Sequence, residues 1–211
     1  MTRLRLPALY AIVDPLDTGA DPVRLGQAML DGGARLLQLR LKRADTRVLV
    51  DVGHALREAT RRTGALFLLN DRPDVARAVA ADGVHLGQED VPAAVARRVL
   101  GPSAIVGIST HDHGELTAAL AADPDYVAVG PVYATGSKEA ALPPRGLAIV
   151  SAARRRTALP LVAIGGITAE TAAAVRDAGA DSVAMIGALV RAPEVAAATR
   201  TALAALARPS V

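Results

Sequence analysis

The chain has 211 residues, of which 51% are apolar, only 2% are aromatic and none is cysteine. The length fits one large domain or two small ones, and the missing cysteines exclude disulfides, thiolate catalysis and cysteine metal sites, as is typical of a cytoplasmic protein. With 24 basic against 21 acidic residues the net charge is only +3. No aromatic residue interleaves with the basic run 154–156, no signal peptide is apparent, and no apolar run approaches the roughly 20 residues that span a bilayer. We therefore expect neither a nucleic-acid nor a membrane partner.

Apolar runs of strand length alternate with helix-length segments along the chain. The predicted strands span residues 8–13, 36–40, 67–69, 84–86, 105–108, 126–129, 161–164 and 183–186. The predicted helices follow Asp21-Pro22, span about 45–62, begin again at Pro73, and then cover 93–100, 115–122, 147–156, 169–178 and 193–206. Eight strands alternating with eight helices predict an α/β fold, a (β/α)8 TIM barrel, as a single domain over residues 1–211. A doubly wound open sheet is the competing fold, but the chain lacks the glycine-rich turn expected after its first strand.

Polar residues gather where the predicted strands end, which is where barrels build their active sites. In chain order these residues are Asp14, Gln38, Arg40, Lys42, Asn70, Asp71, His85, Gln88, Asp90, Ser109, His111, Thr135, Ser137, Lys138, Gly165, Gly166 and Gly187. Thr135, Ser137 and Lys138 fall in segment 130–145, which carries three prolines and two glycines and reads as a long loop. Loops of that length in compact domains are usually functional or disordered.

Asp71 and Asp90 follow two successive strands of the predicted barrel. Parallel strands joined by a crossover helix bring their carboxyl ends to the same side, so the two carboxylates can lie close together. Such a pair suits Mg²⁺, which takes oxygen ligands and completes its shell with water and substrate phosphates. The alternative is that each aspartate caps the helix that begins at the following proline.

Cations and glycines at the strand ends suggest two anion sites. Arg40, Lys42 and Lys138 around two carboxylates suit a metal-bound diphosphate, although Arg40 and Lys42 could also be a solvated strand end. The Gly165-Gly166 pair and Gly187 follow the last two strands, where barrels commonly bind phosphate with backbone N–H groups.

Three other polar residues have structural alternatives. His85 alternates with Val84 and Leu86, so it points opposite to them, into the barrel or out, and a lone histidine on a strand is more often a packing residue than a catalytic one. Ser109 and His111 could instead cap the following helix. His54 and His113 are expected on the surface.

The order and spacing of these segments resemble the thiamine phosphate synthase family over nearly the whole chain, from about residue 9 to 206. The matching segments are QLRLK at 38–42, NDR at 70–72, VHLGQED at 84–90, STH at 109–111, GP at 130–131 through TGSK at 135–138, and AIGGI at 163–167. The resemblance implies a Mg²⁺-dependent transferase that joins hydroxymethylpyrimidine diphosphate to thiazole phosphate and releases diphosphate. A homo-oligomer stays open.

The resemblance also implies roles for individual residues. Asp71 and Asp90 would hold Mg²⁺, and the diphosphate would contact Arg40, Lys42, Asn70, Ser109 and Lys138, with Arg40, Lys42, Ser109 and Lys138 acting in catalysis. Gln38 and His85 would face the pyrimidine, and the thiazole phosphate would contact Thr135, Ser137, Gly166 and Gly187. The chain departs from the family pattern at Leu41, often acidic, and at Gly187, often serine.

Two other functions are open. A thiazole tautomerase related to this family would not need the diphosphate and metal residues, all of which this chain keeps. A noncatalytic sensor of phosphate ligands could keep Gly165-Gly166 while dispensing with Lys138 and one carboxylate.

Overall fold

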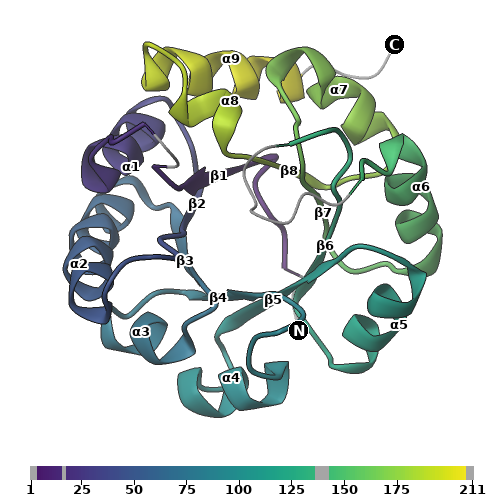
Figure 1. Cartoon of the computed structure of the whole chain (residues 1–211), viewed down its shortest axis with the longest axis horizontal. Helices are drawn as coiled ribbons and strands as arrows, with labels where there is room; N and C mark the ends of the chain where they lie inside the picture. The colour runs from purple at the N-terminus through teal and green to yellow at the C-terminus, as the bar shows by residue number, and fades with distance from the viewer. Residues whose placement is uncertain (1–3, 16–17, 136–142, 208–211) are drawn as a thin grey trace.

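The computed structural model of the chain describes residues 4–15, 18–135 and 143–207, and these fold into a closed barrel of eight parallel strands. The strands follow one another around the barrel in chain order, and β8 pairs with β1 to close it (Figure 1). Their bounds are β1 (Leu9–Val13), β2 (Leu36–Leu39), β3 (Leu66–Asn70), β4 (Gly83–Leu86), β5 (Ile105–Thr110), β6 (Tyr126–Val129), β7 (Leu161–Ala163) and β8 (Ser182–Met185). The predicted (β/α)8 barrel is therefore confirmed.

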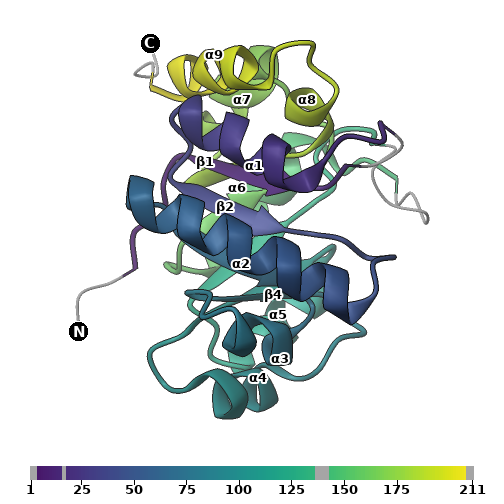
Figure 2. The same ribbon diagram turned by 90° about the vertical axis from the view of Figure 1, so that its left-hand side faces the viewer.

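Helices surround the barrel on its outside, with α1 and α2 covering the flank of β1 and β2 (Figures 1 and 2). They are α1 (Pro22–Asp31), α2 (Thr46–Thr63), α3 (Pro73–Ala78), α4 (Ala93–Leu100), α5 (His113–Ala121), α6 (Gly146–Arg156), α7 (Ala169–Asp177), α8 (Gly187–Val190) and α9 (Val195–Ala207). The sequence did not predict α8, because four residues are too few to display helical periodicity. It also placed the end of β5 two residues early, since the polar Ser109 and Thr110 continue the strand.

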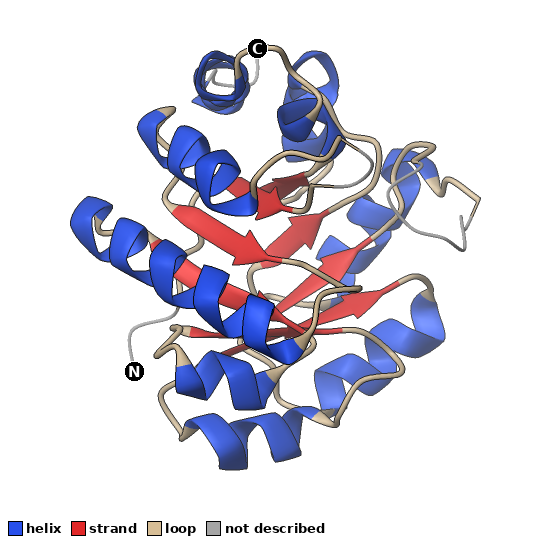
Figure 3. Ribbon diagram, turned by 60° about the vertical axis from the view of Figure 1, so that its left-hand side comes forward, coloured by secondary structure: helices blue, strands red, loops and turns tan. Residues whose placement is uncertain are grey.

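Side chains of each strand alternate between the barrel interior and the surrounding helices. Leu9, Ala11 and Val13 of β1 belong to the apolar layer between strands and helices, whereas Tyr10 and Ile12 belong to a separate cluster inside the barrel. Figure 3 shows the two layers, with the strands enclosed by helices. The period of two along a strand produces this division. Both faces of the strands are thus buried, which explains their nearly continuous apolar sequences.

Glycine on β5 makes room for a large side chain inside the barrel. A Cβ atom on Gly107 would lie 2.0 Å from the ring of Tyr126, which is fully buried on the neighbouring β6. Any side chain at position 107 would displace that ring. The interior can therefore hold an aromatic residue beneath the barrel mouth.

The amino ends of three strands share one polar arrangement. Asp82, Asp125 and Asp181 each precede a strand, and each carboxylate accepts from the backbone N–H of the first or second residue of the neighbouring strand, at 2.7 to 2.8 Å. Each also pairs with an arginine from an outer helix: Arg57 with Asp82, Arg97 with Asp125, and Arg154 with Asp181. These bonds tie strands and helices together at the end of the barrel opposite the candidate site.

Candidate active site at the barrel mouth

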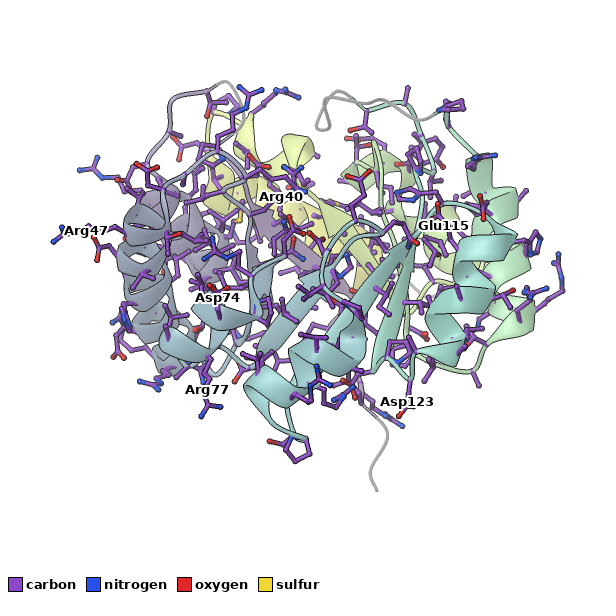
Figure 4. All side chains as sticks on the ribbon, turned by 60° about the horizontal axis from the view of Figure 1, so that its bottom comes forward. Arg40, Arg47, Asp74, Arg77, Glu115 and Asp123 are labelled. Atoms are coloured by element: carbon purple, nitrogen blue, oxygen red, sulfur yellow. The ribbon has the colours of Figure 1, made fainter. Side chains whose placement is uncertain are left out.

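A cavity opens at the carboxyl ends of the strands and encloses about 570 Å³, including the solvent at its mouth. Its polar lining comprises Tyr10, Gln38, Arg40, Lys42, Asn70, Asp71, His85 and Ser109. Figure 4 shows Arg40 at this mouth, while Arg77 and Asp123 lie toward the opposite end of the barrel. Most of the polar residues predicted from strands 2 to 5 are thus brought together in one cavity.

The two aspartates proposed as metal ligands lie side by side. The carboxyl groups of Asp71 and Asp90 are within hydrogen-bonding distance of each other, and Lys42 Nζ lies 2.9 Å from Asp71 Oδ2. Burial and the neighbouring Asp71 carboxyl raise the pKa of Asp90 to about 6. A half-buried carboxylate pair concentrates negative charge, which a divalent cation would offset. Among the described residues, no group of three or more His, Asp or Glu side chains is arranged to hold a metal.

Neither aspartate caps a helix, so that alternative is wrong. The residue at the N-cap of α3 is Arg72 and that of α4 is Pro92, and neither helix has a side-chain cap. Asp90 instead accepts from the N–H of Gly87 at 2.6 Å. Asp71 adopts a left-handed backbone with φ of 63°, which aspartate tolerates better than most residues and which places its side chain at the cavity.

Arg40 is held by Asp14, the residue that follows β1. Its guanidinium forms an ion pair with Asp14, and both side chains are almost buried. Asp14 was a candidate without an assigned role, and the structure makes it the partner that orients Arg40. Arg40 is therefore not a solvated strand end. Lys42, by contrast, leaves half of its side chain exposed and is able to move toward a ligand.

A row of hydrogen-bonded side chains crosses the cavity floor. Gln38 Nε2 donates to the hydroxyl of Tyr10 at 2.6 Å, and the hydroxyls of Tyr10 and Tyr126 lie 3.0 Å apart. His85 contacts Tyr126 through Nδ1 and Ser109 through Nε2, both at 2.8 Å. His85 therefore points into the barrel. Both tyrosines were missed from the sequence, where the available signal was a rare aromatic residue at an inward-facing position of a strand.

The residues after β5 divide between the cavity and the helix that follows. Ser109 belongs to β5, and Asp112 caps α5 by accepting from the N–H of Glu115. The capping alternative for Ser109 and His111 is therefore wrong. His111 pairs instead with Glu115 through Nδ1 at 2.8 Å, and it does not line the cavity. His54 and His113 are exposed, as predicted.

Three of the residues proposed for a second anion, Thr135, Gly166 and Gly187, lie outside this cavity lining. Gly166 has φ of 60°, and a Cβ atom there would lie 2.3 Å from the carbonyl oxygen of Ala134, so the glycine permits the loop leading to Thr135 to pack closely. Gly187 is the first residue of α8. Thr135 is half-buried. Ser137 and Lys138 lie outside the described residues.

The fold and this site define a (β/α)8-barrel protein with paired carboxylates and cations at the mouth of the barrel. Residues 9–189 match the family model described as thiamine monophosphate synthase. The chain belongs to this family, whose members are transferases of thiamine biosynthesis.

Individual relatives agree over nearly the full length. The chain is 47% identical to a thiamine-phosphate synthase of Moorella thermoacetica over 91% of this chain and 92% of that protein. It is 44% identical to one of Laribacter hongkongensis, with 92% of each chain covered. The solved structure of a thiamine phosphate pyrophosphorylase from Pyrococcus furiosus superposes with a TM-score of 0.86 at 36% identity, covering 94% of both chains. Among the described residues, no helix is long and apolar enough to cross a membrane.

Proposed function

We propose that this chain condenses 4-amino-5-hydroxymethyl-2-methylpyrimidine diphosphate with 4-methyl-5-(2-phosphoethyl)thiazole, or its carboxylated form, to give thiamine phosphate and diphosphate. The observation that carries this proposal is the cluster of Asp71, Lys42 and Arg40 in the cavity lining, with Asp90 beside Asp71. A thiazole tautomerase would have no use for this cluster. A cytoplasmic location stays a prediction.

Asp71 and Asp90 would hold Mg²⁺, because they offer carboxylate oxygens that lie close together. When bound, the ion would neutralise the diphosphate and make it a better leaving group. Lys42 would leave Asp71 to contact the diphosphate, and the exposure of its side chain permits that movement. Arg40, already oriented by Asp14, would meet the same anion together with Asn70, Ser109 and Lys138.

The floor and walls of the cavity would bind the pyrimidine. Gln38 and His85 would face the ring, while Ile12, Ala128 and Val162 give the cavity an apolar wall that excludes water. An electron-rich aminopyrimidine can carry positive charge on its methylene carbon as the C–O bond to diphosphate breaks. Water exclusion would leave the thiazole nitrogen as the nucleophile that attacks this carbon.

The thiazole phosphate would bind beyond β7 and β8. Barrels frequently bind phosphate with the loops after these strands and with a short extra helix, a position that α8 occupies. Backbone N–H groups at Gly166 and Gly187 would hold the phosphate, and Thr135 and Ser137 would add hydroxyl donors.

The direct test is to incubate the purified protein with both substrates, with and without Mg²⁺, and to measure thiamine phosphate and diphosphate. We expect both products in equal amounts, only with Mg²⁺ and only when both substrates are present. Isomerisation of the thiazole without release of diphosphate would instead identify a tautomerase. Binding of the substrates without any turnover would identify a sensor.

A further inference from the structure

Five buried or half-buried side chains form a continuous hydrogen-bonded row across the barrel interior. In order they are Gln38 on β2, Tyr10 on β1, Tyr126 on β6, His85 on β4 and Ser109 on β5. We call these residues the polar row. Every member except Tyr126 lines the cavity, and Tyr10 and Tyr126 are almost completely buried.

We propose that Tyr10 and Tyr126 are positioning residues. Through them, whether Gln38 presents a donor or an acceptor to the ligand depends on which of the two Ser109 presents. The coupling fixes which ring the cavity accepts, and this part of the inference rests on the proposed function. Tyr10 and Tyr126 would thus determine the specificity for the pyrimidine through their contacts with each other and with Gln38 and His85.

The direction of the hydrogen bonds follows from the orientation of the Gln38 amide, whose nitrogen faces the hydroxyl of Tyr10. The amide nitrogen of Gln38 can only donate, so Tyr10 accepts from it and must direct its own proton to Tyr126. Tyr126 then directs its proton to Nδ1 of His85. In this order Nδ1 of His85 accepts, so the ring proton lies on Nε2, which donates to the hydroxyl of Ser109. The hydroxyl proton of Ser109 remains for a further acceptor.

Burial makes this proton order cooperative. Burial raises the pKa of Tyr10 and of Tyr126 well above the usual tyrosine value, so both hydroxyls stay protonated. The ring of Tyr126 stacks on that of His85 with centroids 5.6 Å apart, and Gly107 on β5 leaves space for it. Because each hydroxyl has one proton and these partners are enclosed, reversing one bond requires reversing all of them.

The order determines what each end of the polar row presents to a ligand. With its nitrogen turned to Tyr10, Gln38 keeps its carbonyl oxygen as an acceptor, while Ser109 keeps its hydroxyl as a donor. In the reversed order Gln38 would present N–H and Ser109 would present only lone pairs. An anionic oxygen at Ser109 needs a donor, so it favours the order in which Gln38 accepts. The cavity should then prefer a pyrimidine with an exocyclic amino group over one with an oxo group.

Nitrogen NMR of the imidazole rings tests the order directly. In protein labelled with ¹⁵N-histidine, proton-bearing and bare ring nitrogens resonate far apart, and the exposed His54 and His113 serve as internal references. We expect His85 to carry its proton on Nε2 in the wild type. Tyr10→Phe should keep this tautomer, because Tyr126 still donates to Nδ1. Tyr126→Phe should populate the other tautomer.

Substrate selection tests the coupling. The wild type should prefer the amino pyrimidine diphosphate over its oxo analogue in kcat/KM, and Tyr10→Phe and Tyr126→Phe should each reduce that preference about tenfold, the effect of one hydrogen bond. The KM for thiazole phosphate should stay unchanged in both variants. Circular dichroism and thermal melting confirm that each variant is folded, and if Tyr126→Phe does not fold, the wild-type spectrum and Tyr10→Phe still decide the question.

A proton on Nδ1 of His85 in the wild type would overturn the proposed order, and full substrate preference in folded Tyr10→Phe would overturn the coupling. Failure of the proposed function has a different result. In that case the wild type would release no diphosphate from either pyrimidine, while the NMR spectrum would still report the tautomer of His85.

Discussion

Two carboxylates at the mouth of the barrel carry the proposed chemistry. Asp71 and Asp90 lie together although each follows a different strand, and Lys42 forms an ion pair with Asp71. Two adjacent carboxylates of this kind suit a divalent cation, and their closeness separates a metal site from two helix caps.

Asp71→Asn and Asp90→Asn should each remove most Mg²⁺-dependent turnover while leaving the fold intact. Each change removes a charged ligand, yet asparagine also tolerates the left-handed backbone of Asp71 and can still accept from Gly87 at position 90. The measurement is the initial rate of thiamine phosphate formation at several Mg²⁺ concentrations. Asp74→Asn, at an exposed ion pair with Arg72, is the matched control and should keep wild-type activity. Normal activity in either site variant would remove that residue from the metal site.

The same pair makes stability depend on pH. The pKa of Asp90 is raised to about 6 in the folded protein, against about 3.9 for an unfolded aspartate. Between these values the folded chain binds more protons than the unfolded chain. The contribution of Asp90 to the free energy of unfolding is therefore fully present below about pH 4 and is lost as the pH rises through about 6. Thermal melts without Mg²⁺ from pH 4.5 to 7.5 should show this loss, and Asp90→Asn should reduce it. An equal pH dependence in Asp90→Asn would show that other groups cause it.

The loops and helices around the mouth shape the proposed thiazole phosphate site through close backbone packing. Gly166 packs against Ala134 and Tyr133, and Gly187 opens α8. These positions differ in what a side chain would meet, so they offer a pair of contrasting substitutions.

Gly187→Ser should be tolerated and should lower the KM for thiazole phosphate, whereas Gly166→Val should raise it. A serine hydroxyl can add one hydrogen bond to a charged group, worth about 1.5–3 kcal/mol. Valine at 166 would clash with the carbonyl of Ala134 and would also strain a backbone with φ of 60°. The KM values for both substrates, measured on folded protein, separate the two effects. Normal thiazole phosphate binding by Gly166→Val would place the second anion site elsewhere.

The aspartates at the amino ends of the strands should affect the free energy of unfolding and have no effect on the catalytic rate. Asp82→Ala would leave the N–H of Phe67 without this acceptor and Arg57 without its carboxylate, and should lower the free energy of unfolding by about 3 kcal/mol. Urea denaturation measures the loss, and Asp74→Ala, which removes only an exposed pair, should cost less than about 1 kcal/mol. The rate per folded molecule should stay unchanged, because these residues lie opposite the mouth. A lower kcat in folded Asp82→Ala would contradict this separation of roles.

For the barrel as a unit, ligand binding at the mouth should stabilise the entire fold, because the site draws on several strands. Mg²⁺ with inorganic diphosphate, at 100 times its dissociation constant, should add about 2.7 kcal/mol. The test is the shift in Tm with both ligands, which EDTA should reverse and Asp71→Asn should lack. An equal shift in Asp71→Asn would show that the diphosphate binds without the metal pair.

The architecture and most of the mouth were predictable from local pattern. Short apolar runs separated by helix-length segments specify eight strand–helix units, and the residue after each run must lie at the carboxyl end of its strand. Arg40, Asn70, Asp71 and Ser109 were found in this way. The short helix α8 was not, because one turn leaves no periodic signal.

Only closure of the barrel decided which side chains meet across it. Tyr10 and Tyr126 are 116 residues apart, and their hydrogen bond depends on the inward phase of β1 and β6 and on the space left by Gly107. The pairing of Arg40 with Asp14 likewise requires the register of β1 against β2, which brings the ends of the two strands together. The raised pKa of Asp90 arises from burial and from a neighbour on another loop. Local sequence encodes the element and its inward or outward phase, whereas contacts across the barrel depend on how all eight strands close.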